Sequence, residues 1–172
     1  ECHDLFHGIQ LLHEVSPRTL DMVVGFGERL SAFLLSAHLT RIGYPARYVD
    51  ARRFMITDLR HGGGHLRMEE SAKAIRRFFK DPGLSIITGF IAASAEGVTT
   101  NLGRGGSDTT AAVIGAALDA DRIEIWTDVD GFMSADPRLV ENAFVLPQLN
   151  MDEASELSYF GAKVIHPQTL MP

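Results

Sequence analysis

The sequence of 172 residues has only one cysteine, Cys2, and no run of about 20 apolar residues. A single cysteine cannot form a disulfide within the chain and fits a reducing compartment, so we expect a cytoplasmic protein. Without a long apolar run, we expect no membrane partner. Basic residues are fewer than acidic ones, 16 against 22, and the net charge of −6 argues against general nucleic-acid binding.

Familiar site patterns are missing as well. The chain has no G-x-x-x-x-G-K-[ST] phosphate loop and no G-x-G-x-x-G dinucleotide loop. His3 and His7 are spaced to share one side of a helix near Cys2, but no second cysteine completes a zinc set. We therefore predict no metal ion held by protein side chains.

What is present is typical of a globular α/β protein. Hydrophobic residues make up 45% and charged residues 22%, which suits one domain with a core. Apolar periodicity predicts helices and short β-branched runs predict strands, and the two alternate along the chain. This alternation predicts a three-layer sandwich of helices around a mainly parallel sheet. We expect helices over residues 5–12, 17–40, 68–80 and 107–118, strands over 46–49, 84–88 and 122–127, and a hairpin over 90–100.

The longest predicted helix begins at Ser16, whose hydroxyl can cap it, with Pro17 in its first turn. A bend is expected near Gly25 and Gly27, and the strand over 84–88 is expected to be buried. The side of the helix expected to face the core carries Leu30, Phe33 and Leu34.

The first candidate site is the glycine turn over residues 103–108, GRGGSD, directly before a predicted helix. Glycine lets the backbone approach a ligand closely. Ser107 or Asp108 can cap the helix, whose free N–H groups would then face an anion. Arg104 can hold a carboxylate or phosphate through two parallel hydrogen bonds. The pattern favours an anion site over an ordinary tight turn.

Three further segments carry weaker signals. Residues 126–138 follow a predicted strand, where open α/β sheets bind ligands, although Asp-Gly and Asp-Pro are also ordinary turn signals. Lys163 could bind phosphate, although most lysines are simply exposed. Glu28 lies among glycines in an apolar helix, where its partner is either a ligand's ammonium group or Arg29 and solvent.

Together these segments resemble the aspartate kinase family of the amino-acid kinase superfamily. The similarity covers most of the chain from Ser16 onward, in the family's order and spacing. Its motifs are VVGFGERLSA (23–32), TGFIA (88–92), TTNLGRGGSDTTAA (99–112), IWTDVDGFMSADPR (125–138) and ELSYFGAKVIHPQTLMP (156–172).

The resemblance implies an αβα sandwich and phosphoryl transfer from ATP to the β-carboxylate of L-aspartate. The product, 4-phospho-L-aspartate, begins the route to lysine, threonine and methionine. A carboxylate acceptor is already ionised at neutral pH, so no general base is needed. Catalysis then consists of positioning and of neutralising charge on the transferred group.

The resemblance also implies residue roles. Arg104 would clamp a substrate carboxylate and Glu28 would take the aspartate ammonium group. Phe90 and Ser107 would complete the substrate pocket, and Asp108 would orient the family's catalytic lysine. Mg²⁺ would be held mainly through the phosphates, and the full-length enzyme would be a homo-oligomer. The residues expected around the nucleotide are Thr127, Asp128, Met133, Asp136, Arg138 and Lys163.

The sequence departs from the family pattern in several places. The family's lysine–glycine loop, K-F-G-G-[TS]-S, is absent, and the chain stops before the family's last strand and any regulatory domain. We therefore expect residues 1–172 to be a catalytic domain truncated at both ends and inactive alone. The loop over 59–66 replaces F-G-x-A, Asn101 stands where threonine is commoner, and Met133 stands where some members have tyrosine.

Two alternatives stay open at this point. One is a sibling enzyme with the same core, a kinase of acetylglutamate, glutamate, carbamate or uridylate. The other is a non-catalytic fragment that binds a nucleotide or an amino acid.

Overall fold

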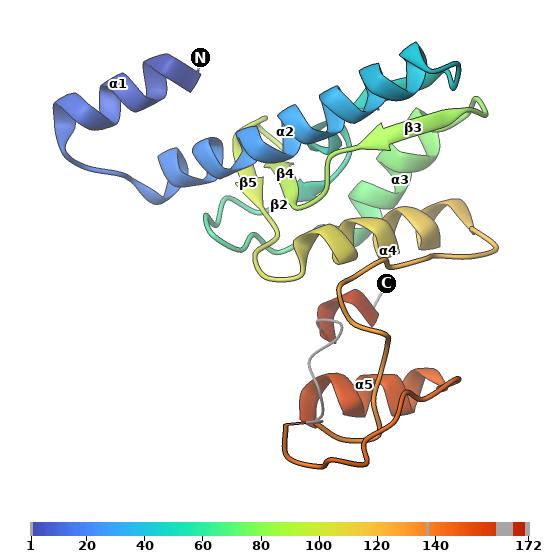
Figure 1. Ribbon diagram of the computed structural model, residues 1–172. Helices are drawn as coiled ribbons and strands as arrows, with labels where there is room; N and C mark the ends of the chain where they lie inside the picture. Colours follow the sequence, from blue (N-terminus) through green and yellow to red (C-terminus); the bar gives the residue numbers. More distant parts are fainter. Residues whose placement is uncertain (1, 137, 161–166, 171–172) are drawn as a thin grey trace.

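The computed structural model of the chain describes residues 2–136, 138–160 and 167–170, and in it helices alternate with short strands (Figure 1). In chain order the elements are α1 (Cys2–Leu12), α2 (Pro17–Arg41), β1 (Ala46–Val49), the 3₁₀ helix η1 (Ala51–Arg53), β2 (Ile56–Thr57), α3 (Met68–Phe78), β3 (Leu84–Ile87), β4 (Ile91–Ser94), β5 (Thr99–Asn101), α4 (Gly106–Leu118), α5 (Met151–Phe160) and the 3₁₀ helix η2 (Pro167–Leu170).

The described strands form two small sheets between layers of helices. β1 and β3 are parallel and pair in register from Ala46 with Leu84 to Val49 with Ile87. β2 and β4 are also parallel, and β5 returns antiparallel to β4. α2 packs against β1, β3 and β5, while α3 and α4 pack together on the other side of the strands (Figure 1). The predicted three-layer α/β architecture is thus present, with mostly parallel pairing.

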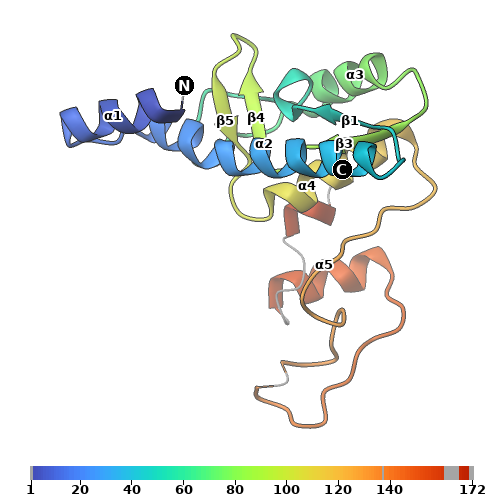
Figure 2. The same cartoon turned by 45° about the horizontal axis from the view of Figure 1, so that its top comes forward.

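The core lies between the strands and the α3–α4 layer. Its side chains come from residues that follow β1, from β4 and from the buried sides of α3 and α4. α5 and the long segment before it lie apart from the sheets in both views (Figure 1, Figure 2). No described helix is both long and apolar enough to cross a membrane.

α2 begins as predicted and runs through its glycines without a break. The Ser16 hydroxyl accepts the N–H of Thr19 at 3.1 Å and caps the helix. The backbone stays helical at Gly25 and Gly27, so these residues do not interrupt it. A Cβ on Gly25 would lie 3.1 Å from Cγ2 of Ile91, so glycine there lets α2 lie close to β4.

The expected burial of the large apolar stripe on α2 is wrong. Leu30, Phe33 and Leu34 are 57%, 54% and 64% exposed. The buried side of α2 carries the small or polar residues Asp21, Gly25, Ala32 and Ser36 instead. Small side chains allow a helix to approach the strands closely, so α2 turns its bulky side outward.

The strand expected over residues 122–127 is also absent, since these residues have no regular structure. A strand needs a hydrogen-bonding neighbour. Here Ile123 instead packs on α4, where a Cβ on Gly115 would come within 2.3 Å of it, and Trp126 is 90% exposed. The expected strand over 84–88 is confirmed as parallel, but it is only partly buried because it has one neighbour among the described strands.

Candidate active site

Three segments that are far apart in sequence meet where the chain leaves β3. The Gly89 N–H donates to the carboxylate of Glu28, which is half-buried on α2. Burial raises the pKa of Glu28 above its usual value, and the Gly89 hydrogen bond only partly offsets this effect. On its other side, a Cβ on Gly89 would lie 2.9 Å from the Ser107 hydroxyl oxygen. Glu28, Gly89 and Ser107 therefore lie together.

Phe90 adopts a left-handed backbone conformation, with φ of 66°, next to this cluster. Such a conformation is strained for a residue with a bulky side chain, and it persists only where the surroundings fix it. The Phe90 N–H donates to the Thr110 hydroxyl at 3.2 Å, and its carbonyl accepts the N–H of Leu102 at 2.9 Å. Its ring lies against Gly106, where an added Cβ would be 3.0 Å from Cδ2. Thr110 and Gly106 belong to α4, and Leu102 directly precedes the glycine turn.

The glycine turn places Arg104 between two left-handed glycines, Gly103 with φ of 71° and Gly105 with φ of 70°. Gly105 is the N-cap of α4, and no side chain caps this helix. The prediction that Ser107 or Asp108 caps it is therefore wrong, because the helix starts at Gly106 and both residues lie inside its first turn. An uncapped N-terminus leaves backbone N–H groups available to an anion.

Arg104 and Asp108 differ in their surroundings. Arg104 is exposed and makes no hydrogen bond or ion pair with any residue that the structure describes. Asp108 is half-buried in the first turn of α4, where the helix dipole favours a carboxylate. The site thus offers an anion for an ammonium group at Glu28, and a free guanidinium and helix N–H groups for carboxylate or phosphate oxygens.

The structure brings only some of the residues expected around the nucleotide close together. Thr127 and Asp128 are exposed and hydrogen-bond each other at 3.2 Å. Asp136 accepts from the Arg138 guanidinium at 2.7 Å and 3.0 Å, and these hydrogen bonds lower the pKa of Asp136 to about 2. Asp136 lines an open hollow of about 740 Å³ between this segment and α5. Nothing places Thr127 or Asp128 at that hollow.

The remaining two nucleotide candidates have less structural support. Met133 pairs with Val145 through an isolated bridge, three residues before Asp136 in the chain. Lys163 lies outside the described residues, so its predicted role stays a prediction.

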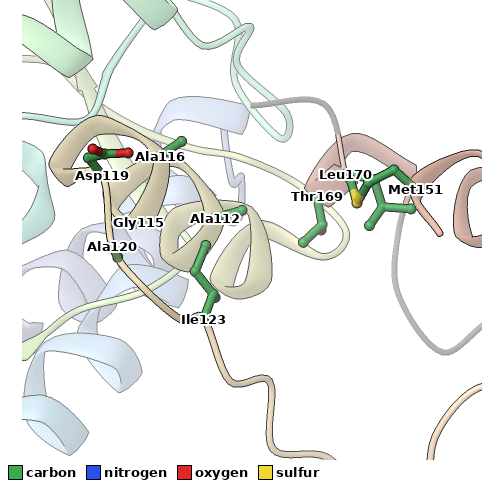
Figure 3. A pocket seen from close by; sticks show the side chains of 9 residues that line it. All are labelled: Ala112, Gly115, Ala116, Asp119, Ala120, Ile123, Met151, Thr169 and Leu170. Carbon is green, nitrogen blue, oxygen red and sulfur yellow. The ribbon is translucent and has the colours of Figure 1, made fainter. Parts of the chain in front are cut away.

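A second, smaller hollow of about 210 Å³ lies beside α4 (Figure 3). Small α4 residues and Ile123 form one side of it, and Met151, Thr169 and Leu170 form the other. Among the described residues that line it, none is a predicted site residue and Asp119 alone is charged.

Sequence reasoning missed a buried polar network beside the glycine turn. Asp21 is 1% exposed on α2 and accepts from His61 and Asn101 side chains and from the Gly62 N–H. A signal existed, since Asp21 shares the helical spacing of Gly25, Ala32 and Ser36 on the buried side.

The described residues also bear on metal binding. Within residues 2–136, 138–160 and 167–170, no three His, Cys, Asp or Glu side chains are grouped so as to hold a metal ion.

Comparison with known proteins identifies the family to which this chain belongs. The sequence model of the amino acid kinase family matches residues 4–172. The chain belongs to the amino acid kinase family. Within this family it is 43% identical to aspartokinase 1, chloroplastic, of Arabidopsis thaliana, over all of this chain and 31% of that protein. It is 44% identical to the bifunctional aspartokinase/homoserine dehydrogenase 1, chloroplastic, of Zea mays, over 88% of this chain and 17% of that protein.

Solved structures agree with the family. The crystal structure of E. coli aspartokinase III in complex with aspartate and ADP (R-state) superposes with a TM-score of 0.87 at 38% identity. That match covers 99% of this chain and 40% of the neighbour. The chain spans less than a third of the length of the Arabidopsis relative, so the activity of a whole aspartokinase is a proposal for it.

Proposed function

We propose that residues 1–172 form part of an aspartate kinase catalytic domain, which transfers the γ-phosphoryl group of ATP to the β-carboxylate of L-aspartate. The observation that carries the proposal is the meeting of Glu28, Gly89 and Ser107 beside the turn that presents Arg104. L-Aspartate has an ammonium group and two carboxylates, and this site offers a partner of the right charge for each kind of group. The similarity to aspartokinases supports the same substrate.

Glu28 favours aspartate over most sibling substrates. Its carboxylate is partly desolvated, which is unfavourable unless a cation pairs with it. Acetylglutamate, carbamate and uridylate have no free ammonium group to do this. Glutamate does have a free ammonium group, so the length of its side chain must distinguish it from aspartate.

In the proposed reaction the acceptor β-carboxylate attacks the γ-phosphorus, the bond from that phosphorus to the bridging oxygen breaks, and ADP leaves. The acceptor is ionised at neutral pH and needs no base. Arg104 holds the acceptor's other carboxylate, and Ser107 and the α4 N-terminus position the reacting groups. Asp108 orients the catalytic lysine that members of the family have in their lysine–glycine loop. Bound Mg²⁺ would neutralise phosphate charge.

The nucleotide is proposed to lie near Met133, Asp136 and Arg138, with Thr127, Asp128 and Lys163 as its further contacts. The E. coli neighbour was crystallised with ADP, which supports nucleotide use by this chain. The homo-oligomeric state and the cytoplasmic location stay predictions.

The test is ATP-dependent hydroxamate formation by the full-length protein with four acceptors, L-aspartate, L-glutamate, N-acetyl-L-glutamate and succinate. We expect turnover with L-aspartate and at least about tenfold lower kcat/KM for each of the others. Preferred use of N-acetyl-L-glutamate would make the protein a sibling kinase. Binding of ATP and L-aspartate without turnover would make it a binding module.

A further inference from the structure

Asp21 is a buried carboxylate that the proposed chemistry does not use. It lies on α2 and is 1% exposed. Three donors from two other segments satisfy it: Nδ1 of His61 at 2.6 Å, the Gly62 N–H at 3.0 Å, and the side-chain amide of Asn101. A buried carboxylate persists only with such partners, so Asp21 ties α2 to the loop over 60–66 and to the end of β5.

Asn101 links Asp21 to the glycine turn. While its NH₂ group donates to Asp21, its Oδ1 accepts the Gly103 N–H at 2.8 Å. Its backbone carbonyl accepts the Gly64 N–H at 2.7 Å, and the residue is 4% exposed. Asn101 therefore has one orientation, because turning the amide over would place its NH₂ group against the Gly103 N–H.

The loop also supports the turn by direct contact. A Cβ on Gly103 would lie 3.4 Å from the Gly62 carbonyl oxygen and 3.4 Å from Cα of Gly63. Arg104 follows Gly103 and has no partner among the described residues, so the backbone of residues 103–105 sets the point from which its side chain extends.

We propose that Asp21, acting through Asn101, is a positioning residue that fixes the turn carrying Arg104 and thereby sets the affinity of the site for the acceptor's carboxylate. This inference rests on the proposed function. A displacement of about 1 Å in a group that orients a substrate can cost as much as 100-fold in rate. An Arg104 turn released from Asn101 should therefore bind aspartate less well while the nucleotide contacts stay intact.

The chain offers a matched control in Asp58. This carboxylate holds both ends of the same loop, accepting the N–H groups of Arg60 at 3.2 Å and His65 at 3.0 Å. It makes no hydrogen bond or ion pair with residues 101–106 among those that the structure describes. Asp58→Asn should remove the ion pairs with Arg60 and His65 while its side-chain oxygen keeps both N–H hydrogen bonds, so the turn should stay in place.

The test compares Asp21→Ala, Asn101→Ala and Asp58→Asn in the full-length protein. Asp21→Ala removes the acceptor of the Asn101 amide, and Asn101→Ala removes the side chain that links Asp21 to the turn. For both we expect the KM for L-aspartate to rise by about 10–100-fold, with the KM for ATP unchanged, while Asp58→Asn keeps both values. The conservative variant Asp21→Asn can keep its side-chain oxygen towards the Asn101 amide and the Gly62 N–H, with its NH₂ group towards His61, and should retain most of the aspartate affinity.

A second readout does not depend on kinase activity. In ¹H–¹⁵N spectra, Asn101→Ala should shift or broaden the amide signals of residues 103–105, and Asp58→Asn should not. Equal KM changes for aspartate and ATP in Asn101→Ala, or unchanged amide signals at 103–105, would overturn the inference even if Asp21→Ala failed to fold. If the full-length protein without substitutions does not phosphorylate aspartate, the proposed function is wrong. The amide signals of residues 103–105 would still show whether Asn101 positions the turn.

Discussion

A Cβ atom on Gly89 would lie 3.0 Å from Cα of Ser107, so the backbone leaving β3 touches the first turn of α4. This contact brings Ser107 to the place where the Gly89 N–H meets the Glu28 carboxylate. No side chain larger than hydrogen fits between the two backbones. The geometry of the candidate site therefore depends on glycine at position 89.

Gly89→Ala should separate Ser107 from Glu28 and destabilise the chain. The new methyl group meets backbone as well as side-chain atoms of Ser107, so α4 or the β3–β4 connection must move. Overpacking of this kind costs about 1–3 kcal/mol of the free energy of unfolding. The control is Gly8→Ala on α1, where an added Cβ meets nothing within 4 Å. Chemical denaturation of both variants tests the prediction, and equal stabilities would contradict it.

Glu28→Gln should stabilise the chain at neutral pH. Burial raises the pKa of Glu28 above 4.5, so its ionised form is disfavoured in the folded state. Above the folded pKa, the neutral amide avoids this cost, and we expect a gain below about 1 kcal/mol for a half-buried group. The gain should shrink as the pH falls and vanish below 4.5, where Glu28 is protonated in both states. Unfolding curves between pH 3 and pH 8 measure it, and a variant less stable at pH 7 would refute the argument.

Arg104→Lys should weaken the hold on the α-carboxylate of aspartate. Lysine keeps the charge but loses the planar pair of donors. We expect kcat/KM for L-aspartate to fall at least about tenfold, roughly 1.4 kcal/mol. Binding of β-alanine, which is aspartate without its α-carboxylate, should hardly change. Unchanged aspartate kinetics would remove Arg104 from the pocket.

Asp136 should titrate far below an ordinary aspartate. Hydrogen bonds from the Arg138 guanidinium and N–H lower its pKa from 3.8 to about 2. The stabilisation is therefore present above 3.8 and is lost as the pH falls through about 2. Arg138→Gln should raise the pKa part of the way back, because the backbone N–H is kept. Carboxyl ¹³C NMR titration measures it, and a pKa near 3.8 in the parent protein would mean that the pair does not form.

Features set by neighbouring residues were predictable from the sequence. The start of α2 depends on Ser16 and Pro17, and the hairpin of β4 and β5 turns near Gly97, where φ is 80°. The β-branched run of β3 predicted a parallel strand, which pairs with β1. The motifs that carry the family resemblance likewise brought Glu28, Phe90 and Ser107 into one hypothesis.

Features set by distant partners were not predictable. A helical stripe does not reveal that its large side chains face outward, because that depends on how closely α2 approaches β4 at Gly25. Residues 122–127 alternate like a strand, but a strand forms only beside a partner. The helical spacing of Asp21 could have indicated that it is buried, but its hydrogen bond to Asn101 joins residues 80 positions apart, so no local pattern predicts that partner.

The central claim, that Glu28 binds the ammonium group of aspartate, is tested most directly by comparing the dissociation constants of L-aspartate and succinate. Succinate has both carboxylates but no ammonium group. The parent protein should bind L-aspartate about 10–100-fold more tightly than succinate, since a charge-assisted hydrogen bond contributes about 1.5–3 kcal/mol. In Glu28→Gln, measured by calorimetry under the same conditions, this preference should disappear. A Glu28→Gln variant that keeps the full preference for L-aspartate would contradict the account.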